Sequence, residues 1–146
     1  MQRLAAEAEG LELGTNIVLL PLHNPMEIAE IGAFLDVITG GKFNLGVGLG
    51  YRPEEFNMDR VPINQRVGRM VEGVEIIRRL WREDNVTHHG KYWQFDNMTI
   101  RPRPLRQPAP PVLIAAQVDA AVERAATIGD GWCMVSTPRT DGMVKH

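Results

Sequence analysis

The most informative part of this chain reads FNLGVGLGYRPEEF, from Phe43 to Phe56. Its first half, Phe43 to Val47, is a short apolar run, which is typical of a strand buried on both faces. Its second half is dense in glycine, and glycine allows a turn with positive φ and a close approach of a ligand to the main chain. Aromatic and acidic residues follow at once. This order predicts the ligand-facing end of a strand in a parallel α/β sheet or barrel.

Composition limits the partners that we expect. The 146 residues fit one domain, and 44% apolar with 23% charged residues is ordinary for a soluble globular protein. The net charge is −2 without a basic patch, which argues against nucleic acid and membrane surfaces as partners. No apolar run approaches the roughly 20 residues that span a bilayer. We therefore expect a cytoplasmic protein that binds a small-molecule substrate.

Cysteine and histidine give no sign of a metal site. Cys133 is the single cysteine, which excludes an internal disulfide and a multi-cysteine zinc site, and fits a reducing compartment. His88 and His89 are neighbours on a predicted strand, so their side chains would point to opposite faces. We predict that both are solvated and that no metal is bound.

Strands and helices are expected to alternate along the chain. Asn24 followed by Pro25 is a typical helix start, and Pro21 would end the strand before it. The expected elements are a helix tail over 1–10, strand 11–20, a helix from 25 that ends at 40, strand 43–47, loop 50–64, helix 65–82, a hairpin within 86–100, a proline-rich connector over 101–111, strand 112–116, helix 120–128 capped by Asp119, and strand 132–135. The alternation requires parallel pairing with right-handed crossovers.

Nearly the whole chain, about Leu4 to Trp132, resembles the bacterial luciferase-like monooxygenase superfamily. The pieces that carry the resemblance are LGTNIVLLP at 13–21, HNP at 23–25, LDVITGGKF at 35–43, LGVGLG at 45–50, EF at 55–56, GKYW at 90–93, PRP at 102–104, PPV at 110–112 and GDGW at 129–132. The resemblance implies a TIM-type (β/α)8 barrel, of which this chain would supply about strands three to six. Residues 1–146 would form one partial barrel domain, with a hairpin insertion and connector over 84–111.

A complete barrel of this type needs about 250 residues, so we expect the chain to be a fragment of the full enzyme. Part of a barrel exposes two apolar strand edges, which is unfavourable for an isolated monomer. Either the remainder of the barrel is encoded elsewhere, or two copies pair to complete a barrel-like core. A homo-oligomer is therefore expected.

The resemblance also implies a cofactor, either FMN or the deazaflavin coenzyme F420, and the residues that would bind it. A cis peptide between Asn16 and Ile17 would support the ring, and Gly48 and Gly50 would let the backbone approach it. The resemblance places the cofactor phosphate near the backbone of residues 116–118, namely Ala116, Gln117 and Val118. From the residues alone, an ordinary strand start at 16–17 and a plain strand–helix turn at 116–118 remain open.

Two side chains after the glycines are candidate catalytic residues. The resemblance places Tyr51 and Glu54 near the reactive ring, and Glu54 or Glu55 would be a proton donor if burial raised its pKa. The alternative is a solvated acidic loop, which we favour for Glu55. The glycines over 46–50 lack the G-x-G-x-x-G spacing of a dinucleotide fold, and no helix begins within them.

Two functions follow from the sequence. The first is a flavin- or deazaflavin-dependent oxidoreductase, of the monooxygenase or hydride-transfer type, with its site at the carboxyl-terminal mouth of the barrel. The second is a non-catalytic barrel fragment or scaffold that associates through exposed strand edges.

Overall fold

The computed structural model describes Glu7 and residues 10–133. Most of the helix expected over 1–10 and the end of the strand expected over 132–135 lie outside these residues. The described part is an α/β fold in which strands and helices alternate as predicted. Its parallel sheet contains β1 (Leu13–Gly14), β2 (Val18–Leu19), β3 (Phe43–Gly48), β6 (Val112–Ala115) and β7 (Gly131–Cys133).

β3 is the centre of this sheet. β1 and β2 both pair with one edge of β3, β6 pairs with its other edge, and β7 pairs with β6. Every one of these pairings is parallel, so the carboxyl ends of β2, β3 and β6 come together at one end of the sheet.

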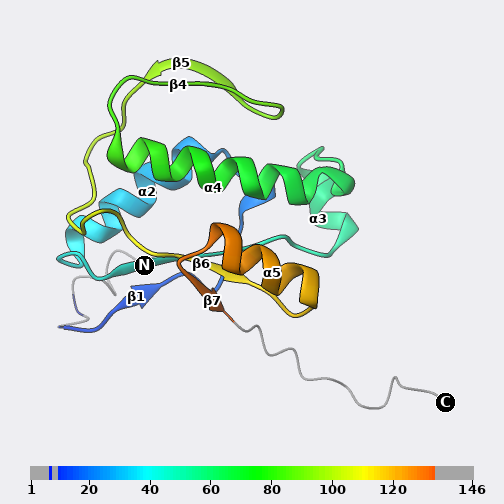
Figure 1. Cartoon of the computed structure of the whole chain (residues 1–146), viewed down its shortest axis with the longest axis horizontal. Coiled ribbons are helices and arrows are strands. Elements are labelled where there is room, and N and C mark those ends of the chain that lie inside the picture. Colours follow the sequence, from blue (N-terminus) through cyan, green and yellow to red (C-terminus); the bar gives the residue numbers. More distant parts are fainter. Residues whose placement is uncertain (1–6, 8–9, 134–146) are drawn as a thin grey trace.

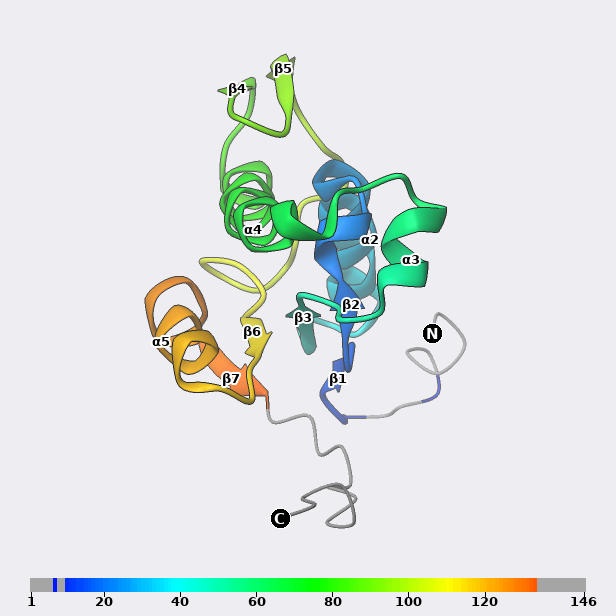
Figure 2. The same cartoon turned by 90° about the vertical axis from the view of Figure 1, so that its right-hand side faces the viewer.

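Helices cover one face of the sheet. The helices are α2 (Pro25–Ile38), α3 (Pro53–Met58), α4 (Arg66–Arg82) and α5 (Asp119–Ile128), with 3-10 turns η1 (Leu20–Leu22) and η2 (Ile63–Gln65). α2 and α4 lie side by side over the sheet, and α5 packs beside β6 and β7 (Figure 1, Figure 2). A separate antiparallel hairpin, β4 (Val86–His89) and β5 (Gln94–Met98), lies on the side of α4 away from the sheet.

The core lies between the sheet and its helices. Leu45 and Val47 of β3 are buried there, while Gly46 between them faces the other side of the sheet. α2 and α4 approach closely because Gly32 has no side chain where the Trp81 ring lies: a methyl group there would come within 2.9 Å of the ring. The Trp81 indole N–H donates to the carbonyl of Ala29 at 2.8 Å, which satisfies this buried polar group.

The single strand expected over 11–20 is instead two short strands separated by a bulge. Between the last pair of β1 and the first pair of β2, this segment has one residue more than β3. At the bulge the Thr15 hydroxyl donates to the carbonyl of Gly46 at 2.8 Å and accepts from its N–H at 2.9 Å. A methyl group on Gly46 would collide with the carbonyl oxygen of Thr15. A side chain therefore replaces the regular ladder here, which alternation of apolar residues does not reveal.

The loop expected over 50–64 was wrong, because this segment contains α3 and η2. Sequence reasoning takes Pro53 as a break, but proline is favoured at the first position of a helix, where no partner for its N–H is needed. Two acids occupy the first turn of α3, which suits the helix dipole. Phe56 anchors the helix and is 1% exposed.

The prediction that His88 is solvated was also wrong. The two histidines do point to opposite faces of β4, but His88 is buried and only His89 is exposed. The His88 ring stacks on Phe95 at 5.7 Å and its Nε2 lies 3.1 Å from a carboxylate oxygen of Glu72. The hairpin therefore packs this face against α4.

Candidate functional site

A cavity of about 580 Å³ opens at the carboxyl ends of β2, β3 and β6. Three segments that are far apart in the sequence form its walls. The lining residues are Asn16, Ile17, Leu19, Gly48, Leu49, Gly50, Tyr51, Arg52, Glu55, Ala115, Ala116, Gln117, Val118 and Ala121. Such a volume lies within the range of about 300–1,000 Å³ that small-molecule and cofactor sites occupy.

The first wall is the bulge between β1 and β2. The Asn16–Ile17 peptide bond is cis, as the resemblance implied. A methyl group on Gly48 would collide with Cδ1 of Ile17, so the Ile17 side chain lies flat on the glycine of the neighbouring strand. The Cys133 thiol, at the end of β7, donates to the Asn16 side-chain oxygen at 3.3 Å. Two residues that are 117 positions apart in the sequence thus meet at this wall.

The second wall is the exit of β3. Gly50 has φ +73°, a conformation that side chains disfavour, and a methyl group there would lie 3.0 Å from the Phe56 ring. The chain turns here into Tyr51 and Arg52, so the strand end stays open to the cavity.

Charged and aromatic groups form the rim of this wall. Tyr51 is 69% exposed, and the Arg52 guanidinium lies 5.5 Å from the centroid of its ring. Arg52 also pairs with Glu55 at 3.7 Å. The hydrogen bond with Tyr51, together with nearby negative charge, raises the pKa of Arg52. Arg52 and Glu55 are the charged side chains of the lining.

The third wall is the turn from β6 into α5. The helix begins at Asp119, not after it: Val118 holds the cap position and makes no side-chain cap. Its carbonyl accepts from the N–H groups of Ala121 and Val122. The Trp132 indole N–H donates to the carbonyl of Ala116 at 2.8 Å and fixes the strand end. The positive end of the α5 dipole therefore faces this part of the cavity.

The structure brings together most of the residues that the sequence singled out. Asn16, Ile17, Gly48, Gly50, Tyr51, Ala116, Gln117 and Val118 all line the cavity. Glu54 does not: it lies exposed on the first turn of α3, and Glu55 lines the cavity in its place. Adjacent side chains on a helix point about 100° apart, so Glu54 and Glu55 of α3 face different sides. A loop prediction for this segment does not contain that difference.

Arg52 lines the cavity but is not among the site residues predicted from the sequence. It stands inside the glycine-dense stretch and supplies the positive charge of the lining, a signal that the sequence did contain. Among the residues that the structure describes, no cluster of His, Cys, Asp and Glu could hold a metal ion. No helix in that same part of the chain is long and apolar enough to span a bilayer.

Comparison with known proteins places the chain in a family. A family profile described as luciferase-like monooxygenase matches residues 2–144. The chain belongs to this luciferase-like family. Among its relatives, the oxygenase component of flavin-dependent trigonelline monooxygenase from Acinetobacter baylyi is 34% identical over 78% of this chain and 32% of its own. F420-dependent glucose-6-phosphate dehydrogenase from Kineococcus radiotolerans is 32% identical over 91% of this chain and 40% of its own.

A solved structure agrees with this membership. The monooxygenase RslO1 from Streptomyces bottropensis superposes on this luciferase-like chain with a TM-score of 0.83 and 34% identity, over 90% of this chain and 40% of its own. The chain thus spans about a third to two fifths of the length of these relatives. Two of these relatives are named as enzymes that depend on a flavin or on F420.

Proposed function

We propose that this chain forms part of the cofactor-binding mouth of a flavin- or deazaflavin-dependent oxidoreductase that acts on a small-molecule substrate. One observation carries the proposal: the β1–β2 bulge and the carboxyl ends of β3 and β6, each with a candidate cofactor residue, converge on a single cavity. In α/β barrels the active site lies at the carboxyl ends of the strands.

The walls of the cavity fit the chemistry of FMN or coenzyme F420. The ring system of either is broad and largely apolar, and Ile17, Leu19 and Ala115 offer apolar surface. Gly48 and Gly50 line the same cavity, and the absence of a side chain on Gly48 lets Ile17 lie close against β3. Both cofactors also carry phosphate, for which a cation and a helix amino terminus are suitable partners. The lining offers Arg52 and the start of α5.

Each candidate residue then has a role. Asn16 and Ile17 would back the ring face, Gly48 and Gly50 would let it approach β3, and the backbone of residues 116–118 would lie near the phosphate end. The Ala116 N–H already donates to the Cys133 carbonyl at 3.3 Å, so the amino terminus of α5 would supply the donors. A bound flavin or deazaflavin supplies the hydride or oxygen chemistry, while the protein binds it, orients the substrate and excludes water.

Two side chains at the rim are candidates for moving a proton. The Tyr51 hydroxyl is one, and Glu54 remains the second residue that the resemblance implied. Because Glu55 lines the cavity and Glu54 is exposed on α3, the carboxylate at position 55 is the better placed of the two. A proton donor must come within hydrogen-bond reach of the atom that it serves.

In the full protein, we propose that this chain supplies strands three to six of a TIM-type barrel, with the hairpin insertion and connector over 84–111 within one domain. The relatives are longer than the matched region, and parallel strands with helices on one face are the unit from which such a barrel is built. A homo-oligomer that covers the open sheet edges fits the same picture.

Equilibrium titration with FMN and with F420 tests the proposal. Cofactor fluorescence measures the binding. We expect at least one of the two cofactors to bind with a Kd of about tens of micromolar or lower. Binding of neither would reject the proposed function and leave the scaffold alternative. The better of the two ligands would also decide between the FMN and F420 branches, which the sequence and the relatives leave open.

A further inference from the structure

One face of α4 contacts two segments that are far apart in the sequence. Gly68, Arg69, Glu72 and Gly73 lie at helical spacings that place them on this face. On one side they meet the hairpin, and on the other they meet η1, which directly follows the β2 wall of the cavity.

The hairpin is seated on α4 by a carboxylate and a glycine. Glu72 accepts hydrogen bonds from the N–H groups of Tyr92 and Trp93 at 3.1 and 3.0 Å. A methyl group on Gly68 would lie 2.7 Å from Cε2 of Tyr92, so the ring rests directly on the helix backbone. These contacts of Gly68 and Glu72 with Tyr92 and Trp93 hold the turn of the hairpin on α4, and we call them the hairpin seat.

Arg69 joins this seat to the segment beyond β2. Its guanidinium carbon lies 4.6 Å from the centroid of the Trp93 ring and 5.8 Å from that of Tyr92, which is within cation–π range. Its Nε donates to the carbonyl oxygen of Pro21 at 2.8 Å. The same side chain is thus stacked under the hairpin and hydrogen-bonded to η1.

Pro21 lies two residues after Leu19, which lines the cavity. Between them, Leu20 is fully buried and packs on Gly73, where a methyl group would come within 3.2 Å of its side chain. Movement of Pro21 would therefore be transmitted to the wall that contains Ile17 and Leu19.

We propose that Arg69 is a positioning residue, which couples the seat of the hairpin to the β2 wall of the cofactor cavity. The proposal rests on the proposed function for its effect on cofactor binding, but not for the coupling itself. The hairpin insertion then acts on the cavity without touching it, and Trp93 is the residue through which it does so.

Hydrogen exchange measured by mass spectrometry tests the coupling without cofactor. We expect R69A and W93A each to raise exchange in segment 17–22 by about tenfold, because local opening follows the loss of local contacts. W93F retains an aromatic face for the guanidinium and should restore protection. R79A is the matched control, since Arg79 lies on the same helix in an exposed pair with Glu83. Unchanged exchange at 17–22 in both R69A and W93A would overturn the proposal.

Cofactor titration supplies the second arm. We expect R69A and W93A each to weaken FMN or F420 binding by about fivefold, with the double variant no weaker than either alone, because coupled residues are not additive. Thermal unfolding of each variant separates this local effect from a general loss of stability. Additive losses would contradict the coupling. If the wild type binds neither cofactor, the proposed function fails, whereas hydrogen exchange still decides the role of Arg69.

Discussion

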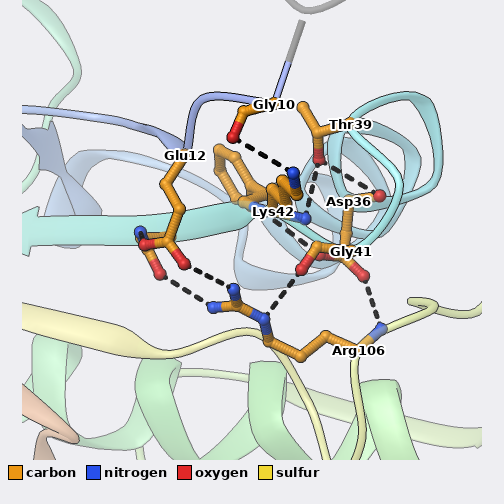
Figure 3. Close-up of polar contacts among 9 residues, drawn as sticks. Gly10, Glu12, Asp36, Thr39, Gly41, Lys42 and Arg106 are labelled. Atoms are coloured by element: carbon orange, nitrogen blue, oxygen red, sulfur yellow. Dashed lines mark hydrogen bonds and ion pairs between the residues drawn. The ribbon is translucent and has the colours of Figure 1, made fainter.

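The two ends of the parallel sheet are built in different ways. At the carboxyl end, the cavity is lined mostly by glycines and apolar side chains, with one charged pair on its rim. At the amino end, a dense network of hydrogen bonds and ion pairs joins β3, the end of α2 and the proline-rich connector (Figure 3). In TIM-type barrels, such as the one that we propose for the full protein, the carboxyl end carries function and the amino end carries stability.

Arg106 is the centre of the amino-end network. Its backbone N–H donates to the Asp36 carboxylate at 2.8 Å, and its Nε donates to the Gly41 carbonyl at 2.8 Å (Figure 3). Its terminal nitrogens contact Asn44 at 3.1 Å and Glu12 at 2.9 Å. Hydrogen bonds from Asn44 and Arg106 hold the pKa of Glu12 below its usual value. These contacts fix the proline-rich connector to the amino end of the sheet, although the two segments are far apart in the sequence.

The polar network and the cavity thus lie at opposite ends of the parallel sheet. Polar side chains bond one another at the amino end, whereas at the carboxyl end Gly48 and Gly50 line the cavity and Ile17 packs on Gly48. Variants at the amino end should therefore change stability and not cofactor affinity, and variants in the cavity should do the reverse.

The largest effect is expected at Asp36. This carboxylate is fully buried and accepts the N–H groups of Arg106 and Phe43, at 2.8 and 3.4 Å. Asp36→Ala leaves both donors without a partner, which should lower the free energy of unfolding by about 3 kcal/mol. Urea unfolding measures the loss, and Glu83→Ala, which removes an exposed pair, should change it by less than about 1 kcal/mol. Equal losses in the two variants would contradict the stabilising role of this end.

The next effect concerns Gly48. In Gly48→Val the new side chain must displace Ile17 from its place on β3, so we expect at least about a tenfold loss of cofactor affinity, or about 1.4 kcal/mol. Gly40 is the matched control at the other end of the sheet. It has φ +66° and open space around it, so Gly40→Ala should lower stability by about 1 kcal/mol with no change in affinity. Titration of both variants checks the contrast, which fails if Gly40→Ala weakens binding as much as Gly48→Val.

A smaller effect is expected at Glu72, and it depends on pH. Burial opposes ionisation, but hydrogen bonds from Trp93, His88 and Tyr92 outweigh it and hold the pKa of Glu72 below its usual 4.5. A carboxyl group whose pKa is lower in the folded state stabilises the protein fully at pH values above its pKa in the unfolded state. This stabilisation is lost as the pH falls through its pKa in the folded state.

Glu72→Gln should therefore lower the free energy of unfolding by about 1 kcal/mol at pH 7. The difference from the wild type should shrink as the pH falls below the usual carboxyl range. Urea unfolding at several pH values measures both. A difference that stays constant with pH would show that the charge of Glu72 does not hold the hairpin.

The smallest effect is expected at Arg52, whose side chain is exposed. Arg52→Ala should weaken FMN binding by only a few-fold, since an ion pair made by an exposed side chain contributes little. Riboflavin lacks the phosphate, so its affinity should not change. Parallel titrations of FMN and riboflavin make the comparison, and an equal loss for both ligands would rule out a phosphate contact by Arg52.

Sequence reasoning recovered the alternating α/β order, because apolar runs, glycines and capping signals are local. The family resemblance supplied eight of the lining residues, but it pointed to Glu54 where Glu55 lines the cavity, and it did not include Arg52. Sequence reasoning missed α3, since Pro53 is compatible with both a break and a helix start. It also missed the bulge at Thr15, where a side chain of one strand bonds the backbone of another. The burial of His88 depends on Glu72, sixteen residues earlier. Such contacts between distant segments are set by tertiary packing, which no local pattern encodes.

The most direct test is hydrogen exchange of the protein with and without saturating FMN or F420. If the three strand ends form one cofactor site, the bound cofactor will slow exchange together in segments 15–19, 48–52 and 115–121, and leave the amino-end network around Arg106 unchanged. Protection confined to one of these segments, or centred on the amino end, would contradict the account.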